Sequence, residues 1–298
     1  MTILKNLTTK EVARLCRVSD ATVKRWEDAG LIKSERTSGG HRRFRAEEIA
    51  RFQREQNLGL KLTHGDESPA KALARRRANK SHSHSTLFHA LVAGAEEDAA
   101  NQITSAHLQS APVVEIFDNL ICPAMRRVGE LWYKGELTIA QEHLATRTLH
   151  NAIYKLRHLL PVPEMNGEVA MCCSFEADFH ELPTHMVQMT LENEGWEVLN
   201  FGANMPLYSL AEEVFQHSPA VVCISATMIT DIERLARDYK EFRERVGKLK
   251  IPIVLGGRAF FDEQIRRRFP AELHAESFAE VAAFTRRLDA AQASFSGV

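Results

Sequence analysis

The fold of the C-terminal half is decided by residues 169–183, which read VAMCCSFEADFHELP. The first five residues are apolar or carry thiols, and a short uninterrupted run of this kind is typical of a buried strand. The polar segment that follows contains Asp178 and His180. A carboxylate placed so close to a histidine can hold one ring N–H and so fix the other ring nitrogen as a metal donor. The stretch predicts a buried strand with a metal ligand beyond its carboxyl end.

Three further apolar runs follow, at residues 198–201, 220–225 and 251–257. Amphipathic stretches of helical period separate them, so the order is strand, helix, strand, helix, strand, helix, strand. This alternation predicts an α/β domain with a doubly wound, Rossmann-like parallel sheet. Ligands of such sheets bind outside the carboxyl ends of the strands.

The expected strand ends carry polar or small residues. Ser225 and Thr227 follow the third run and supply hydroxyls for a phosphate or a base, whereas Gly256 and Gly257 end the fourth run. Paired glycines allow the backbone to approach a ligand closely. Together with the Asp-x-His pair, these residues predict a site for a ligand that has a metal and a nucleotide-like tail.

Residues 86–160 place apolar side chains at helical spacing, with breaks near Pro112 and Gly135, and so predict a four-helix bundle. Within it, residues 131–143 read LWYKGELTIAQEH. Trp132 stands before a glycine turn, and Glu142 and His143 follow in the next helix. From the residues alone, two interpretations stay open: a core tryptophan, or an aromatic plate against a flat ligand.

The N-terminal segment has the signature of two short capped helices. Thr8 and Glu11 are spaced as a capping box, Ser19 can cap a second helix, and Gly30 can end it. Two helices joined by a tight turn indicate a helix-turn-helix. Its second helix would present three side chains to base edges and phosphates, namely Thr22, Lys24 and Arg25.

Residues 36–44, RTSGGHRRF, follow this pair of helices. The two glycines predict a hairpin turn. The strand after the turn carries His41, Arg42 and Arg43, which suit contact with phosphates, and Phe44 anchors it. We therefore expect a winged helix-turn-helix, an α-rich DNA-binding domain, and double-stranded DNA as a partner; a small helical domain with a basic, solvated loop is the alternative.

The bulk composition sets wider limits. The formal net charge of −1 excludes a uniformly basic coat, although bases outnumber acids within residues 5–54. No apolar run approaches the ~18 residues that a membrane span needs. Five cysteines without metal-ligand spacing favour reduced, mostly buried thiols. These features predict a cytoplasmic protein without a membrane partner.

Residues 7–55 resemble the MerR family of transcription regulators. The resemblance implies that Arg42 and Arg43 contact the DNA backbone and that Thr22 and Arg25 lie at the major groove. It also implies dimers on near-palindromic operators. The long C-terminal coiled coil that usually dimerises this family is missing, so another part of the chain is expected to bring copies together.

The C-terminal half resembles cobalamin-binding domains of the methionine-synthase type, and the cap motif is similar to that of the light-responsive CarH/LitR repressor branch of MerR-type regulators. The resemblance implies that His180 is the lower axial cobalt ligand with Asp178 behind it. Two groups of residues complete the implied site. The nucleotide tail would be held by Ser225, Thr227, Gly256 and Gly257, and the upper adenosyl ligand would be surrounded by Trp132, Ile139, Glu142 and His143.

Two positions depart from the family pattern. Pro183 stands where the motif has glycine, which stiffens the chain after His180. Tyr133 follows the cap tryptophan where the light-responsive branch commonly has a histidine. A phenol is a poor cobalt ligand at neutral pH, so an illuminated state is expected to lack a second histidine ligand from this position.

We therefore predict four segments: a DNA-binding domain (1–59), a flexible linker (60–85), a four-helix cap (86–163) and a cobalamin-binding-like domain (164–298). The predicted function is a repressor whose oligomeric state, dimer or tetramer, and operator binding depend on adenosylcobalamin and light. Heme, another tetrapyrrole or no ligand at all are the alternatives. An enzyme is not expected, since cobalamin enzymes need a further catalytic domain of ~200 residues.

Overall fold

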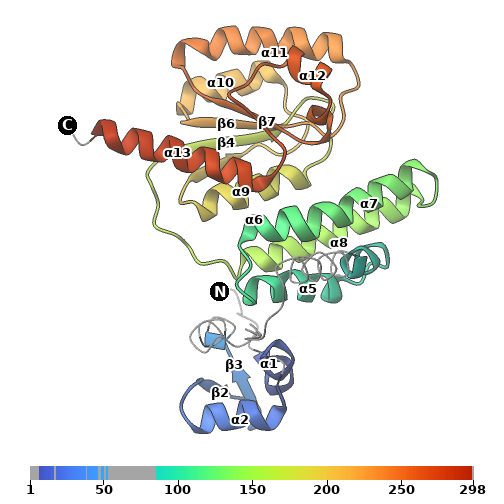
Figure 1. The fold of residues 1–298 in the computed structure, drawn as a ribbon, viewed down its shortest axis with the longest axis vertical. Coiled ribbons are helices and arrows are strands. Elements are labelled where there is room, and N and C mark those ends of the chain that lie inside the picture. The colour runs from blue at the N-terminus through green and yellow to red at the C-terminus, as the bar shows by residue number, and fades with distance from the viewer. Residues whose placement is uncertain are drawn as a thin grey trace, which may run out of the picture. The chain divides into compact units, whose positions relative to one another are not determined.

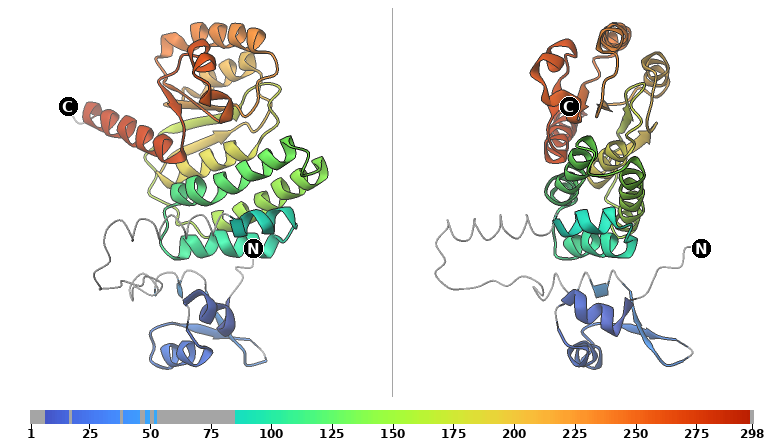
Figure 2. Two further views of the ribbon diagram at one scale, coloured as in Figure 1. Left: turned by 45° about the vertical axis from the view of Figure 1, so that its right-hand side comes forward. Right: turned by 90° about the vertical axis from the view of Figure 1, so that its right-hand side faces the viewer.

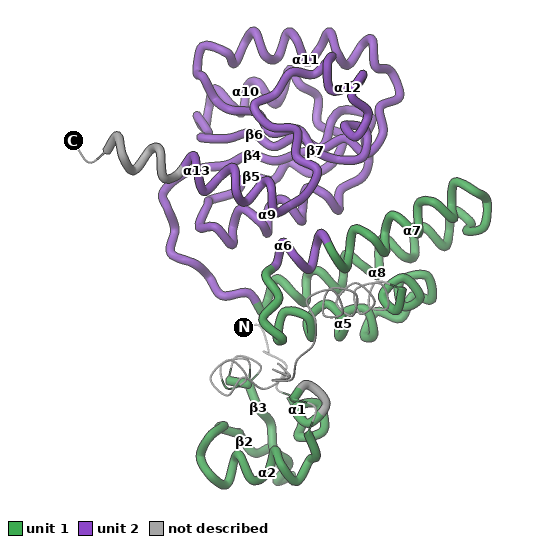
Figure 3. The backbone as a smooth tube through the Cα atoms, in the orientation of Figure 1, with its two compact units in different colours: residues 1–112, 119–159 green, residues 113–118, 160–298 purple. Residues whose placement is uncertain are grey.

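The computed structural model describes residues 7–16, 18–37, 39–45, 48–49, 52 and 85–296 (Figure 1). The chain divides into two compact units (Figure 3). The first contains residues 1–112 and 119–159, and the second contains residues 113–118 and 160–298. Apart from Ser85, the linker predicted over residues 60–85 lies outside the described residues.

The described N-terminal residues include the helices α1 and α2, helical residues at 48–49 and 52, and a small antiparallel sheet of strand order β1-β3-β2. The elements are β1 (Leu7–Thr8), α1 (Thr9–Cys16), α2 (Asp20–Asp28), β2 (Ser34–Arg36) and β3 (Arg42–Phe44). Strand β1, which the sequence did not predict, pairs with β3.

Side-chain caps start both helices where the sequence predicts them. The Thr8 N–H donates to Glu11 Oε2 at 2.6 Å, and the Glu11 N–H donates to Thr8 Oγ at 3.3 Å. These two bonds form the expected capping box. The Ser19 hydroxyl accepts the Thr22 N–H at 3.2 Å. After α2, Gly30 has a φ of +73°, the left-handed conformation that ends many helices.

The β2–β3 hairpin lies where the sequence predicts a wing. Arg36 pairs with Arg42 across the ladder, and the Gly40 N–H closes the turn onto the Thr37 carbonyl at 2.8 Å. Phe44 is fully buried and anchors the hairpin in the core of this region. That core also contains residues of both helices and of the following segment: Val12, Ala13, Cys16, Val23, Ile32, Ile49 and Phe52.

The central region is helical. Residues 85–92 form a first helix. The elements after it are α5 (Glu96–Leu108), α6 (Val113–Ile116), the π-helical turn η1 (Phe117–Ile121), α7 (Cys122–Tyr133) and α8 (Ile139–Arg157). Helix α8 packs against α5 and α7, and Gly135, with a φ of +74°, lies in the turn from α7 to α8.

The C-terminal region is a parallel five-stranded sheet of order β5-β4-β6-β7-β8. Its strands are β4 (Val169–Ser174), β5 (Glu197–Asn200), β6 (Val221–Ser225), β7 (Ile253–Gly256) and β8 (Leu273–Ala275). The connecting helices are α9 (Leu182–Asn193), α10 (Leu207–His217), α11 (Ile232–Val246), α12 (Glu263–Arg268) and α13 (Phe278–Ser296), with 3₁₀ turns η2 (Gly247–Leu249) and η3 (Arg258–Phe261). The predicted parallel sheet is confirmed, and the edge strand β8 is additional.

Helices cover both faces of this sheet (Figures 1 and 2). Met171 and Cys173 of β4 point to the face that α10 and α11 cover. Ala170 and Cys172 point to the opposite face, against α9 and α13. Because alternate residues bury on opposite faces, the strand is apolar without interruption.

None of the described helices has the length and apolar character required to span a bilayer. All five cysteines are free thiols, and four of them are buried.

Asp118, in the π-helical turn, fastens this turn to the sheet region. Its carboxylate accepts the N–H groups of Phe278 and Ala279 at 2.9 and 3.1 Å, and so caps the start of α13. The Phe117 ring lies edge-on to Phe278, with 5.3 Å between the ring centroids. Burial raises the pKa of the Asp118 carboxyl, although the two N–H donors oppose that rise.

The raised pKa predicts a pH dependence. Because the folded state favours protonated Asp118, its contribution to stability is present below the unfolded pKa of about 4 and is lost as pH rises through the folded pKa. Relative to Asp118→Asn, the wild type should lose free energy of unfolding as pH increases from 3 to 6. Urea unfolding of both proteins over this range measures their free energies of unfolding. A wild-type free energy that rises relative to that of Asp118→Asn as pH increases would contradict the raised pKa.

Candidate cofactor site and nucleic-acid interface

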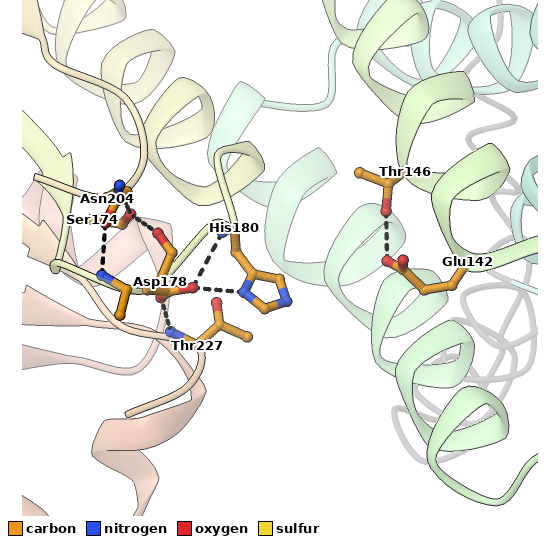
Figure 4. A network of polar contacts seen from close by, with 8 residues as sticks. Glu142, Thr146, Ser174, Asp178, His180, Asn204 and Thr227 are labelled. Carbon is orange, nitrogen blue, oxygen red and sulfur yellow. Dashed lines mark hydrogen bonds and ion pairs between the residues drawn. The ribbon is translucent and has the colours of Figure 1, made fainter. Parts of the chain in front are cut away.

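Asp178 is the centre of a hydrogen-bonded cluster at the carboxyl end of β4 (Figure 4). Its side chain is fully buried. One oxygen, Oδ1, accepts the His180 backbone N–H at 3.1 Å and lies 2.6 Å from His180 Nδ1. The other oxygen, Oδ2, accepts the Thr227 backbone N–H at 2.6 Å. Donors to both oxygens compensate the burial of the carboxylate.

His180 is held by Asp178 but remains accessible. Its side chain is 45% exposed. With Nδ1 donating to the carboxylate, Nε2 is the nitrogen that carries the lone pair in the neutral ring. This is the arrangement of a histidine poised to ligate a metal through Nε2. The neighbouring Phe179 is 74% exposed, and Met228, next to Thr227, is 50% exposed. Two exposed apolar residues thus stand next in sequence to members of the Asp178 cluster.

The strand register aligns the other predicted residues. Ser174 of β4 is the partner of Ser225 in β6, which in turn is the partner of Gly256 in β7. The Ser225 hydroxyl is buried and has no hydrogen-bond partner within the described part of the chain. A buried hydroxyl without a partner is costly, so it fits a site that a polar ligand group completes.

The two glycines differ. A Cβ atom on Gly256 would meet only Ala275, at an ordinary contact distance of 3.5 Å. Gly257 has a φ of +99°, and a Cβ atom there would overlap the carbonyl oxygen of Ala226 and lie 2.8 Å from its carbonyl carbon. Close approach of two loops therefore explains Gly257 without any ligand.

The predicted cap residues lie at the turn between α7 and α8. Trp132, near the end of α7, is 40% exposed, and Ile139, the first residue of α8, is 63% exposed. In the first turns of α8, the Thr146 hydroxyl donates to Glu142 Oε1 at 2.9 Å, and His143 Nε2 lies 3.6 Å from Glu142 Oε2. Tyr133, which differs from the pattern of the light-responsive branch, is 87% exposed.

A groove of about 450 Å³ lies between α9 and β5, and it does not include His180. His185 lines it, with Nε2 3.4 Å from Glu181 Oε1. His185 is one helical turn into α9 and is outside the Asp178 cluster. Pro183 stands in the first turn of α9, a position where its missing N–H breaks no hydrogen bond.

Within the described residues, no three histidine, cysteine or acidic side chains gather as a metal cage. The thiols of the sheet are also poor ligands, since burial raises the pKa of Cys223 to about 12. A metal bound at His180 would therefore have no cage of further histidine, cysteine or acidic ligands among the described residues. A single ligand suffices for a metal that already has four nitrogen donors in a macrocycle, as in a corrinoid or a heme.

The predicted DNA-binding residues divide into two groups. Lys24 and Arg25 on α2 and His41 at the wing tip are exposed, whereas Thr22 is half-buried and hydrogen-bonded to Ser19. Arg42 pairs with Glu27 of α2 and lies 3.8 Å from Asp28. Arg43 donates to the carbonyl of Arg42 at 3.1 Å. The Arg42 guanidinium thus links the wing to α2.

Glu27 is ionised in this link. Desolvation opposes its charge, but hydrogen bonds from Ser34 and Arg42 outweigh that effect and hold the pKa of the Glu27 carboxyl below its ordinary value. The carboxylate connects α2 to both strands of the hairpin, because Ser34 lies on β2 and Arg42 on β3.

Three segments of the chain match models of known protein families. Residues 8–44 match the model of MerR family regulatory proteins. Residues 84–157 and 169–280 match two models described as B12 binding domains. The chain joins a MerR-type DNA-binding domain to B12-binding domains. The second of these matches includes Asp178, His180, Ser225 and the two glycines.

Relatives of two kinds are similar to the chain. The HTH-type transcriptional repressor CarH of Myxococcus xanthus is 23% identical over 266 residues, which are 83% of this chain and 87% of CarH. Dimethylamine corrinoid protein 1 of Methanosarcina mazei is 22% identical over 195 residues, 65% of this chain and 90% of that protein. The solved monomethylamine corrinoid protein of Methanosarcina barkeri shares the fold, with a TM-score of 0.55 at 21% identity over 67% of this chain and 94% of its own.

Sequence reasoning missed three features of the Asp178 cluster. Thr227 donates its backbone N–H to Asp178, whereas from the sequence only its hydroxyl was expected to contribute, as a partner of a phosphate or a base. Ser174 and Asn204, which were not predicted, bond to the loop that carries Asp178. Ser174 ends β4 and Asn204 follows β5, and only the folded chain brings these two positions together.

The different surroundings of the two glycines give a test. Gly257→Ala should lower the free energy of unfolding by about 3 kcal/mol, because it combines left-handed strain with a backbone clash. Gly256→Ala should change it by less than about 1 kcal/mol. Urea unfolding measures both, and equal effects would show that loop packing does not explain Gly257.

Proposed function

We propose that the chain is a transcriptional repressor that binds a double-stranded DNA operator and whose oligomeric state is set by adenosylcobalamin and light. The observation that carries the proposal is the exposed His180, held through Nδ1 by a buried carboxylate, in a chain that also has a MerR-type domain. The similarity to the CarH repressor along most of the chain supports the same function.

His180 would hold the cobalt through Nε2, and Asp178 would keep the imidazole ring oriented. Ser225 would donate its unpartnered hydroxyl to the nucleotide tail, near Thr227, Gly256 and Gly257. The upper ligand would be contacted by the exposed cap side chains: Trp132, Ile139, Glu142 and His143. The bound group supplies a cobalt–carbon bond that light can break.

On the DNA side, Lys24, Arg25 and His41 would contact phosphates and base edges, with Thr22 beside them. Arg42 and Arg43 would contact the backbone through the wing that they stabilise. We also propose that each chain contributes one DNA-binding domain to a dimer or tetramer. Once one domain is bound, the others are held at a high effective concentration near the DNA, which strengthens their binding.

The alternatives keep the same protein ligand. A heme could also be held by His180, but it has no nucleotide tail to satisfy Ser225. A repressor that binds no ligand would leave that hydroxyl without a function. A role as a corrinoid carrier for a methyltransferase would not use the MerR-type domain, so we propose that the chain is not an enzyme.

Size-exclusion chromatography and operator binding test the proposal. With adenosylcobalamin in the dark, the full chain should form a larger species and bind its operator more tightly, and light should reverse both effects. His180→Ala should weaken or abolish the response, while His185→Ala serves as a matched control outside the cluster. An elution volume and operator affinity that do not respond to the cofactor would overturn the proposal, and the visible spectrum of the purified protein would distinguish a corrinoid from a heme.

The Glu27–Arg42 pair predicts a change in operator binding opposite to the change expected from charge alone. Removing a carboxylate near DNA ordinarily strengthens binding. Glu27→Gln should instead weaken operator binding by about threefold to tenfold, because the wing loses a charge-assisted link to α2. Glu35→Gln, which removes the exposed wing carboxylate that pairs with Arg45, is the control and should not weaken binding. Tighter binding by both variants would show that orientation of the wing by Glu27 is unimportant.

A further inference from the structure

The loop that carries Asp178 and His180 has an unusual backbone. Ala177 has a φ of +65°, although alanine is not glycine and its Cβ disfavours this conformation. Such a conformation persists only where surrounding contacts hold it. The contacts around Ala177 therefore indicate what fixes the loop.

Asn204, on the loop between β5 and α10, makes those contacts. Its side-chain Oδ1 accepts the Ala177 N–H at 2.8 Å (Figure 4). Its backbone N–H lies 2.9 Å from the Asp178 carbonyl oxygen and 3.1 Å from Ser174 Oγ. Asn204 is itself left-handed, with a φ of +58°, a conformation that asparagine tolerates better than most residues.

Ser174 completes the bracing from inside the sheet. It is fully buried, and its hydroxyl donates to the Asp178 carbonyl at 2.8 Å. The backbone of Asp178 is thus fixed by Ser174 and Asn204, while its side chain is fixed by His180 and Thr227.

We propose that Asn204 is a positioning residue that holds the Asp178–His180 loop in the conformation that His180 needs to bind the cobalt of cobalamin. This inference rests on the proposed function and deepens it. Without the Asn204 side chain, the Ala177 N–H loses its acceptor and the left-handed turn loses a contact that maintains it. His180 would then spend less time in the orientation that a metal requires. The free-energy cost of ordering the loop would reduce the affinity for the ligand.

Substitutions at Asn204 separate its two roles. Asn204→Gly keeps the left-handed backbone and removes only the acceptor, whereas Asn204→Asp keeps an acceptor oxygen in place. Loss of one neutral hydrogen bond should raise the dissociation constant for aquocobalamin about threefold to tenfold in Asn204→Gly. Asn204→Asp should remain close to the wild type.

A double-mutant cycle with His180→Ala shows whether Asn204 acts through the ligand. Asn204→Gly should weaken aquocobalamin binding in the wild-type background and have little effect in the His180→Ala background. Equal weakening in both backgrounds, with equal loss of unfolding free energy, would reveal a merely structural role and overturn the inference.

Electron paramagnetic resonance of bound cob(II)alamin gives a second readout. With ¹⁵N-labelled histidine in the protein, an axial His180 splits the cobalt lines differently from a nitrogen of the cofactor's own base. The histidine-coupled fraction should fall in Asn204→Gly and recover in Asn204→Asp, and an unchanged fraction in Asn204→Gly at unchanged affinity would overturn the inference. If the wild type shows no histidine coupling, the proposed function itself fails, and the inference fails with it.

Discussion

The site depends on one buried negative charge, the carboxylate of Asp178. A carboxylate taken out of water is strongly unfavourable unless donors replace its hydration. Three donors do so: the backbone N–H and the ring of His180, and the backbone N–H of Thr227. Because Thr227 follows β6 and His180 follows β4, the Thr227 donor reaches the carboxylate only when the two strand ends lie side by side. The folded sheet therefore helps to fix the carboxylate that orients the histidine.

The neighbouring strand ends reinforce this coupling. Gly257 lets the loop after β7 approach the backbone of Ala226, the residue directly before Thr227. The Ala226 N–H in turn donates to the Gly256 carbonyl at 2.9 Å, and the Ala259 N–H donates to the Ala226 carbonyl at 3.0 Å. The loop that supplies a donor to Asp178 is thus held by the adjacent loop. A glycine required by packing between loops thus contributes indirectly to the position of His180.

Local pattern explains which parts of this arrangement the sequence predicted. The parallel strands were predicted because both faces are buried, and the Thr8–Glu11 capping box because its residues are three positions apart. Strand β8 was missed since it is an edge strand of three residues with only Ala275 buried. Asn204 was missed for a different reason: its acceptor role depends on a donor, Ala177, that is 27 positions away. Spacing in the sequence carries no information about such a pair.

The DNA-binding region also pairs part of its charge within the protein. Glu27 engages Arg42, and Glu35 engages Arg45, so two wing cations are partly neutralised within the domain. Phosphate contacts dominate affinity for DNA, and each cation paired within the protein contributes less to them. A single DNA-binding domain should therefore bind weakly, and specificity would come from several such domains bound to adjacent half-sites. A chain built in this way gains most from a ligand that changes how many copies associate, which is the control that the proposed function assigns to the sheet domain.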